Sequence, residues 1–142
     1  MRKKIVSMSI FGQGLDLVEV ARISDMIRRH GEHFLRRCFT PAEREYCRRF
    51  HDAAPHFAGR FAAKEAIVKA LGTGFRGKIS WTDMEILPDE QGKPVLALTG
   101  HTQQITARLH IAHWHISISH TRQLALAGAI AESSWEVTHA PA

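Results

Sequence analysis

The sequence lacks the apolar segments that would place it in a membrane. No hydrophobic run approaches the ~20 residues that a membrane-spanning helix requires. Residues 1–11 resemble a signal peptide only faintly, because the apolar part is short and serine-interrupted, no small-residue cleavage site follows, and Asp16 comes soon after. We therefore expect a first β-strand here, a cytoplasmic protein and no membrane partner.

Cysteine is scarce, and repeats and linkers are missing. Cys38 and Cys47 are nine positions apart, a spacing that fits neither a disulfide framework nor paired metal ligands. The 142 residues, 44% hydrophobic and 23% charged, suit one globular domain. Since residues 133–142 show no periodicity, we predict one domain over 1–132 and a loose tail over 133–142.

Acidic residues are few in the first third of the chain. Between positions 28 and 49 the acids are only Glu32, Glu43 and Glu45, beside many arginines, and the net charge is +5. Such a run is most often a solvated face, but the asymmetry favours a docking surface for an acidic partner. Aromatic residues are thinly interleaved here, so no nucleic-acid stacking platform is expected.

The first half of the chain predicts one strand and three helices. Residues 5–17 alternate as a strand, and residues 18–29 form a helix that ends at His30-Gly31. Thr40, Pro41 and Glu43 predict the start of the next helix, as cap, first-turn proline and capping box. A third helix covers residues 61–71.

The second half predicts mostly strands. Residues 81–87 and 94–98 read as a hairpin, residues 100–110 as a short helix, and residues 113–119 and 124–131 as strands. We expect an α+β domain in which an antiparallel sheet packs against helices.

The segment from Arg60 to Gly74 carries the first candidate chemistry. Strong helix formers dominate it, and Gly72 stands where a C-terminal cap belongs. Glu65 borders an apolar stripe, so its charge needs a partner. That partner is either Lys69, in an ordinary i,i+4 surface pair, or a metal ion.

Asp16 supplies a second carboxylate at the end of the first strand. Alone, it is most simply an acid at a helix N-terminus. Together, Asp16 and Glu65 are too few to cage calcium, but they suit Mg²⁺, which keeps waters and takes ligands from a phosphate-bearing substrate. The nearby cations agree with a phosphate ligand; they are Arg60, Lys64 and Lys69.

Histidines offer a different reading. His113 and His115 share one face of a predicted strand and His120 lies just beyond, so a zinc site is conceivable. The sequence places no third suitable ligand. His120, at a strand end, is better explained as a phosphate donor or a turn residue.

Four motifs together resemble one known family, the bacterial holo-[acyl-carrier-protein] synthases, which are 4′-phosphopantetheinyl transferases. They are residues 12–23 (GQGLDLVEVARI), residues 34–40 with Glu43, residues 60–74 (RFAAKEAIVKALGTG) and residues 116–121 (ISISHT). They occur in the order and at the spacings of that family, and they cover nearly everything from Ile10 to Ala131.

The resemblance implies transfer of the phosphopantetheine arm of coenzyme A to a serine of apo acyl carrier protein, in fatty acid biosynthesis. It implies Asp16 and Glu65 as Mg²⁺ ligands and Lys69, with Glu65, as catalytic. It also implies a homotrimer with active sites at subunit interfaces, and contacts to the two substrates. These contacts are Arg60, Lys64, Gly72, Thr73, Gly74 and His120 for coenzyme A, and Arg22, Arg28 and Arg44 for the carrier protein.

Another class of protein stays open on the residues alone. A non-catalytic basic module that binds an acidic protein or nucleic acid explains the arginines and the charge. It leaves Asp16, Glu65 and the glycine turn at 72–74 without a reason. Residues 1 to about 7 and the segment after Glu132 have no counterpart in the family pattern.

Overall fold

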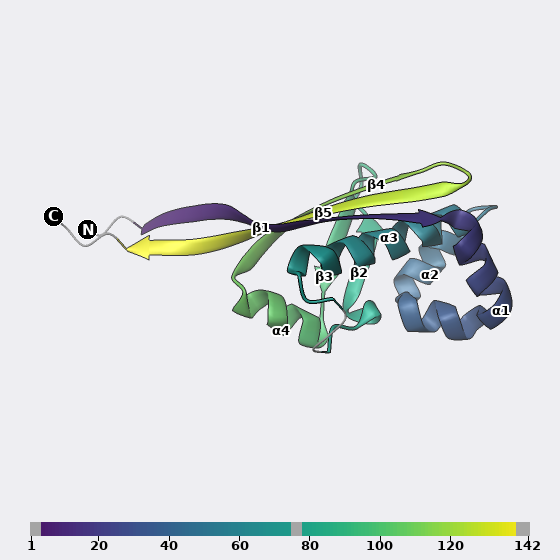
Figure 1. The fold of residues 1–142 in the computed structure, drawn as a ribbon, viewed down its shortest axis with the longest axis horizontal. Helices are drawn as coiled ribbons and strands as arrows, with labels where there is room; N and C mark the ends of the chain where they lie inside the picture. Colours follow the sequence, from purple (N-terminus) through teal and green to yellow (C-terminus); the bar gives the residue numbers. More distant parts are fainter. Residues whose placement is uncertain (1–3, 75–77, 139–142) are drawn as a thin grey trace.

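A three-stranded antiparallel sheet runs along one side of the molecule (Figure 1). Its order is β1 (Lys4–Glu19), β5 (Leu124–Thr138) and β4 (Ile111–His120), so that β5 is the central strand. The hairpin of β2 (Met84–Pro88) and β3 (Pro94–Leu98) forms a separate two-stranded sheet. The computed structural model describes residues 4–74 and 78–138. The expected α+β class, with an antiparallel sheet packed against helices in one domain, is confirmed.

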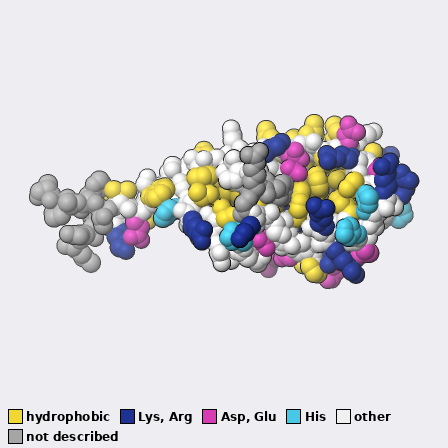
Figure 2. All heavy atoms as spheres, turned by 60° about the horizontal axis from the view of Figure 1, so that its bottom comes forward, with side chains coloured by type: hydrophobic (Ala, Val, Ile, Leu, Met, Phe, Trp, Pro, Cys, Tyr) yellow, Lys and Arg dark blue, Asp and Glu magenta, His cyan; other side chains and the backbone are white. Residues whose placement is uncertain are grey.

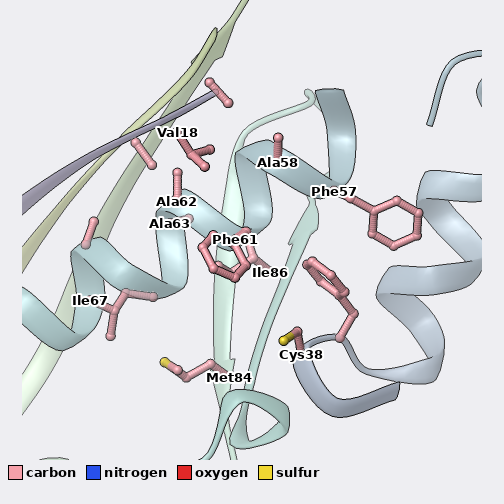
Figure 3. Close-up of a cluster of buried hydrophobic side chains, with 14 of the residues drawn as sticks. Val18, Cys38, Phe57, Ala58, Phe61, Ala62, Ala63, Ile67, Met84 and Ile86 are labelled. Atoms are coloured by element: carbon pink, nitrogen blue, oxygen red, sulfur yellow. The ribbon is translucent and has the colours of Figure 1, made fainter. Parts of the chain in front are cut away.

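Four α-helices pack below this sheet: α1 (Val20–Cys38), α2 (Pro41–Arg48), α3 (Ala54–Leu71) and α4 (Gly100–Arg108). A short 3₁₀ turn covers Trp81–Asp83. Of these, α3 is central, and Figure 3 shows its side chains packed between the sheet and the β2–β3 hairpin. Phe57, Ile67 and Met84 are almost fully buried there. No helix in the described part of the chain is both long enough and apolar enough to span a bilayer.

Glycines allow β1 to lie directly on α3. A Cβ atom at Gly12 would stand 2.1 Å from the carbonyl oxygen of Ala70, and one at Gly14 would stand 2.0 Å from that of Ala66. Side-chain carbon atoms do not approach a backbone oxygen so closely, so these positions require glycine. Asp16 follows at the next position on the same face of β1, and the close approach carries it to α3.

The helix ends predicted from capping residues are confirmed. The Thr40 side chain accepts from the Glu43 N–H, and the Glu43 carboxylate accepts from the Thr40 N–H, which completes the capping box before α2. Gly72 ends α3 in the left-handed conformation, with φ of 78°. The predicted break at His30-Gly31 is a kink, because Gly31 is non-helical while α1 continues to Cys38.

Other boundaries differ from the predictions. Helix α3 begins at Ala54 rather than near position 61, with Pro55 in its first turn. Residues 81–83 form a 3₁₀ turn, and the strand starts only at Met84. The prediction of a loose tail is wrong over residues 133–138, because β5 continues to Thr138; residues 139–142 lie outside the described part.

The ends of β1 and β5 pair with each other beyond the body of the protein. The ladder runs from Lys4 opposite Thr138 to Ile10 opposite Glu132. We call these two segments, residues 4–10 and 132–138, the terminal ribbon. In Figure 1 it projects to the left of the helices. A bulge at Phe11 separates it from the rest of the β1–β5 ladder.

Candidate active site

The end of β1 and the last turns of α3 bring a carboxylate and an amine together. The Lys69 ammonium donates to a carboxylate oxygen of Asp16 at 3.2 Å and to the Leu15 carbonyl at 2.8 Å. The Asp16 side chain is 17% exposed, whereas that of Lys69 is 54% exposed. Lys69 thus lies at the surface of the site, where a phosphate group can reach it.

Glu65, one turn before Lys69 on α3, completes this group. Burial raises the pKa of the Glu65 carboxyl, and the nearby Asp16 carboxylate raises it further. The charges of Lys69 and Arg22 oppose that rise. The two predicted carboxylates therefore lie close enough to repel each other. We call Asp16, Glu65 and Lys69 the carboxylate site.

The chemistry of this donor set fits a magnesium ion. Within residues 4–74 and 78–138, no group of three or more His, Cys, Asp or Glu side chains is arranged to hold a metal. Two carboxylates suffice for Mg²⁺, which keeps several waters and takes further ligands from phosphates. A divalent cation between Asp16 and Glu65 would neutralise the repulsion that raises the pKa of Glu65.

Arg60 and His120 meet elsewhere, in a cavity of about 190 Å³. The buried Arg60 side chain donates from Nε to the Ile86 carbonyl at 3.0 Å, and its guanidinium lies 4.4 Å from the centroid of the Tyr46 ring. His120 is exposed at the end of β4. The hairpin closes the cavity with Pro88 and Pro94. We call this cavity the arginine pocket.

His56 lines the same pocket, and no pattern in the sequence pointed to it. Its ring stacks on Phe50, with centroids 3.5 Å apart, and meets the His120 ring edge-on at 5.1 Å. Burial lowers the pKa of His56, and the charges of His120 and Arg60 act in the same direction. A single histidine between two predicted helices carries no such signal, because the pocket forms only when α2, α3, β4 and the hairpin meet.

Lys64 is not at the surface of either site. Its ammonium is fully buried, where it donates to the Glu43 carboxylate and to the carbonyls of Cys38 and Trp81 at 2.6, 2.7 and 3.0 Å. With three acceptors and no exposure, it has no donor to offer a ligand. This placement argues against the expected contact between Lys64 and coenzyme A. It makes Lys64 a residue that holds α3 to α2.

The glycine turn after α3 is exposed. Gly72 and Gly74 have φ of 78° and 61°, both are exposed, and no atom of the described residues lies within 4 Å of a Cβ placed at either position. The Thr73 hydroxyl donates to the Gly74 carbonyl at 3.2 Å. The turn therefore presents backbone at the surface near Lys69, and its expected contact with a nucleotide stays a prediction.

The three arginines expected to bind the carrier protein differ in availability. Arg22, near the start of α1, is exposed, and its guanidinium carbon lies 5.8 Å from the centroid of the Phe61 ring. Arg28 is exposed and contacts Asp25. The Arg44 side chain is only 16% exposed and lies 3.8 Å from Glu32. The charge of Arg22 acts on the Glu65 carboxyl of the carboxylate site, whereas Arg44 is largely covered.

The histidines considered for zinc do not gather around one point. The His115 ring contacts the Glu132 carboxylate, and His113 lies opposite Glu132 in the β4–β5 register. His120 lies at the far end of β4, in the arginine pocket.

The carboxylate site and the arginine pocket lie on opposite sides of α3. Arg60 and Lys69 are nine positions apart, which is about two and a half turns, so their side chains point roughly 180° apart. Their partners agree: Arg60 contacts β2 and α2, whereas Lys69 contacts β1. One face of a single copy does not present both sites.

Comparison with known proteins gives a consistent result. The family model described as 4′-phosphopantetheinyl transferase superfamily matches residues 12–129. The chain is 46% identical over 123 residues to the holo-[acyl-carrier-protein] synthase of Koribacter versatilis, covering 87% of this chain and 98% of the relative.

Solved structures agree with the sequence relatives. The fold is similar to crystalline holo-[acyl-carrier-protein] synthase from Neisseria meningitidis, with a TM-score of 0.81 and 32% identity over 87% of this chain and 98% of that one. It is also similar to the Bacillus anthracis enzyme solved in complex with coenzyme A (3′,5′-ADP), with a TM-score of 0.73 and 35% identity over 89% and 99% of the two chains.

Proposed function

The chain belongs to the 4′-phosphopantetheinyl transferase superfamily, in its holo-[acyl-carrier-protein] synthase family, and is an enzyme of that class; from this premise we propose its reaction and its site. It transfers the 4′-phosphopantetheine arm of coenzyme A to a serine of apo acyl carrier protein. The observation that carries this proposal is the carboxylate site, in which Asp16 and Glu65 converge beside an exposed Lys69. A basic binding module gives no reason for this arrangement.

The reaction replaces a phosphoanhydride bond of coenzyme A with a phosphoester bond to the carrier protein. The serine hydroxyl of the carrier attacks the phosphorus that bears the pantetheine arm, and the bond from this phosphorus to the bridging oxygen of the pyrophosphate breaks. Adenosine 3′,5′-bisphosphate leaves, and the serine gives up its proton. In such transfers the protein mainly positions groups and neutralises charge.

Asp16 and Glu65 would hold Mg²⁺, which supplies charge neutralisation on the pyrophosphate. Lys69 adds a positive charge at the rim of the same site, where it can meet the phosphate that departs. Gly72, Thr73 and Gly74 bring exposed backbone to that rim. We assign no residue as the base that takes the proton of the serine.

The arginine pocket would bind the nucleotide end of coenzyme A. Arg60 and His120 provide positive or donor groups for a phosphate, and the rings of Tyr46 and His56 provide apolar walls. Arg22 would guide the acidic carrier toward the carboxylate site, and the exposed Arg28 adds to that attraction. Arg44 contributes less, because Glu32 and burial cover it.

We propose that the chain acts as a homotrimer with sites between its copies. One ligand that used both the arginine pocket and Lys69 would need groups on opposite sides of α3, which two adjacent copies can present together. The outer face of the sheet also exposes apolar side chains. Leu15, Leu17, Leu126 and Ile130 are 36–67% exposed there. Exposed apolar faces of this kind mark contacts between proteins.

Compartment and pathway remain predictions. Cys38 and Cys47 are free, which suits the reducing cytoplasm expected from the sequence. We propose that the product serves fatty acid biosynthesis, as the family resemblance leads us to expect.

A mass measurement on the carrier tests the transfer. Wild-type protein incubated with apo acyl carrier protein, coenzyme A and MgCl₂ should give a carrier heavier by one phosphopantetheine arm. Glu65→Gln and Asp16→Asn should give no mass shift, and EDTA should stop the wild-type reaction. Full activity of either variant, or of the wild type in EDTA, would refute the metal assignment. A stable complex without a mass change would instead support the binding module.

A further inference from the structure

The terminal ribbon is the part of the molecule that the transferase reaction does not explain. The family model matches residues 12–129, so both segments of the ribbon lie outside that match. The segments are 122 or more positions apart in the chain, yet they pair in register over seven residue pairs, from Lys4 opposite Thr138 to Ile10 opposite Glu132. A two-stranded ribbon alone is at best marginally stable in water. It therefore needs a surface to cover it.

One face of the ribbon is apolar along β1. Val6, Met8 and Ile10 alternate on this face and are 57%, 41% and 68% exposed. Figure 2, which looks from the side of the helices, shows hydrophobic side chains on the narrow projection beside Lys, acidic and His side chains. On the opposite face, Ser9 and Ser133 bond to each other, and the Trp135 ring packs at 4.1 Å from that of His110. The opposite face also exposes apolar side chains, Ile5, Trp135 and Val137. It continues the inner face of the sheet, however, and the chain's own His110 covers part of it.

The bulge at Phe11 joins this apolar face to the outer face of the sheet. A shift of one residue would normally move the side chains of a strand to the other face. Because the register shifts between Ile10 and Gly12, the side chains of Val6, Met8 and Ile10 continue on the same face as Leu15 and Leu17. We call these five residues the outer stripe. At about 3.3 Å per residue it is roughly 35 Å long.

The outer stripe lies on an edge strand. Among the described strands, β1 pairs only with β5, so the other side of β1 has unpaired backbone groups. A long, exposed and apolar edge strand is a template for association with another chain. The charges of the described ribbon are few, with one lysine and two glutamates: Lys4, Glu132 and Glu136. This composition does not favour nucleic acid or an anionic membrane, in contrast to the net charge of +5 for the whole chain.

The same molecule offers a matching surface. On the outer face of the sheet, a shallow groove of about 240 Å³ lies over Gly128, between Leu15 and Ile130. Its lining is mostly apolar. The hollow exists because Gly128 has no side chain to fill it. A second copy would thus present both exposed apolar side chains and a groove that can receive them.

We propose that the terminal ribbon is an intersubunit clamp: its outer stripe packs against the sheet of a neighbouring copy of this chain. The proposal rests on the homotrimer of the proposed function and extends it to segments that the family match does not include. In a cyclic assembly, the ribbon of each copy covers the next copy, so every stripe is covered. The ribbon acts on the assembly and touches no reacting group.

Two matched double variants of the full chain test the clamp. Val6→Lys/Ile10→Lys charges the outer stripe, and each new lysine stands opposite a glutamate, Glu136 or Glu132, which supports the ribbon itself. The control, Ile5→Lys/Ser7→Lys, adds the same charge to the opposite face of the same strand. Sedimentation velocity over a dilution series gives the protein concentration at which each assembly dissociates.

We expect the outer variant to raise this concentration by about tenfold or more, and the control to change it by less than about threefold. A neutral pair, Val6→Thr/Ile10→Thr, keeps β-branched side chains and should shift it in the same direction as the outer variant. If the lysine pair and the threonine pair at positions 6 and 10 both dissociate at the same protein concentration as the wild type, the clamp is overturned. A second result would also overturn the clamp: the wild type co-sediments with neutral lipid vesicles and the outer variant does not. The stripe would then bind a bilayer.

The carrier mass shift, measured in parallel, separates this inference from the proposed function. The outer variant should recover transfer at concentrations where it reassembles. Normal transfer together with unchanged association would refute the clamp alone. If neither the wild type nor any variant transfers the arm, while the dissociation concentrations change as expected, the transferase function alone is refuted.

Discussion

Glu65 is held in α3 between groups that raise and groups that lower its proton affinity. Burial and then Asp16 raise the pKa of its carboxyl, whereas Lys69 and Arg22 lower it. Holding a carboxylate in this position costs free energy in the folded state without metal, since folding favours the protonated form. Such a cost is typical of a site built to bind a cation.

We predict that Asp16→Asn lowers the pKa of Glu65 in the protein without metal and that Lys69→Met raises it. The first change removes a neighbouring negative charge, and the second removes a positive one. A titration of the Glu65 side-chain carboxyl by NMR measures both shifts. If the pKa of Glu65 is the same in both variants and in the wild type, then the carboxylates do not form one site.

The same carboxyl determines how transfer depends on pH. The raised pKa means that Glu65 takes up a proton at a higher pH than an ordinary glutamate, and a protonated carboxyl is a poor magnesium ligand. We expect the rate at limiting MgCl₂ to fall as pH decreases through this pKa, and excess MgCl₂ to move the fall to lower pH. Glu65→Gln should abolish transfer without lowering the free energy of unfolding, because it removes a charge whose burial is unfavourable.

Gly14 is the residue that brings β1 onto α3. In Gly14→Ala the new Cβ meets the Ala66 carbonyl oxygen, which is backbone and cannot move aside. We expect a loss of about 2–3 kcal/mol in the free energy of unfolding, typical of overpacking, together with a marked loss of transfer because Asp16 moves away from Glu65. Urea denaturation and the carrier mass shift measure the two effects.

Gly128→Ala is the matched control on the neighbouring strand. Its Cβ would stand 3.3 Å from a terminal methyl carbon of Leu15, and this side chain can rotate away. Its cost should be below about 1 kcal/mol. Equal losses in the two variants would show that the close approach at Gly14 is not what requires glycine.

At the scale of elements, a buried ion pair ties α2, α3 and the β2–β3 hairpin together. The Glu43 carboxylate accepts from the Lys64 ammonium at 2.6 Å, from the Thr40 N–H and from the Ile86 N–H. Both side chains are fully buried. This network fixes α3 against the elements that close the arginine pocket.

We predict that Lys64→Met destabilises the fold by about 3–5 kcal/mol, since it leaves the Glu43 charge buried without its cation. The double variant Glu43→Gln/Lys64→Met should cost clearly less, because no isolated charge remains and the amide oxygen can still accept from Thr40. Urea denaturation of both variants measures the difference. A double variant as unstable as the single one would show that loss of packing, and not an unpaired charge, is the cause.

Elements whose signals are local could be predicted from the sequence, whereas those that depend on distant partners could not. Thr40, Glu43 and Gly72 mark helix ends through their own side chains or backbone, and the structure has these ends. The strand at residues 132–138 has no pattern of its own; it forms because residues 4–10, at the other end of the chain, pair with it. Strand pairing across such a separation cannot be seen in a single local window.

In the candidate site, too, some residues could be predicted from local sequence signals and others could not. Asp16, Glu65 and Lys69 were expected together, because Asp16 follows the glycines of the first strand and Glu65 and Lys69 are one helical turn apart. Lys64 differs, because its burial depends on Glu43 and on carbonyls from two other segments. His56 enters the arginine pocket for a similar reason, through contacts with Phe50 and His120.

At the scale of the whole molecule, the position of the two sites on opposite sides of α3 predicts that two copies build one active site. Arg60→Met removes the guanidinium from the arginine pocket, and Glu65→Gln removes a carboxylate from the carboxylate site. Each variant alone should be inactive. In a mixed trimer, some interfaces bring the intact arginine pocket of one copy to the intact carboxylate site of another.

Coexpression of the two inactive variants with different affinity tags, followed by purification on both tags, should therefore restore transfer. In every mixed trimer, one of the three interfaces combines two intact halves, so the activity of the doubly purified protein should reach roughly a third of the wild-type value. Each variant coexpressed with a second tagged copy of itself is the control and should stay inactive. If both halves of the site came from one copy, every copy in the mixture would carry a damaged half, and no mixture of these two variants could regain activity.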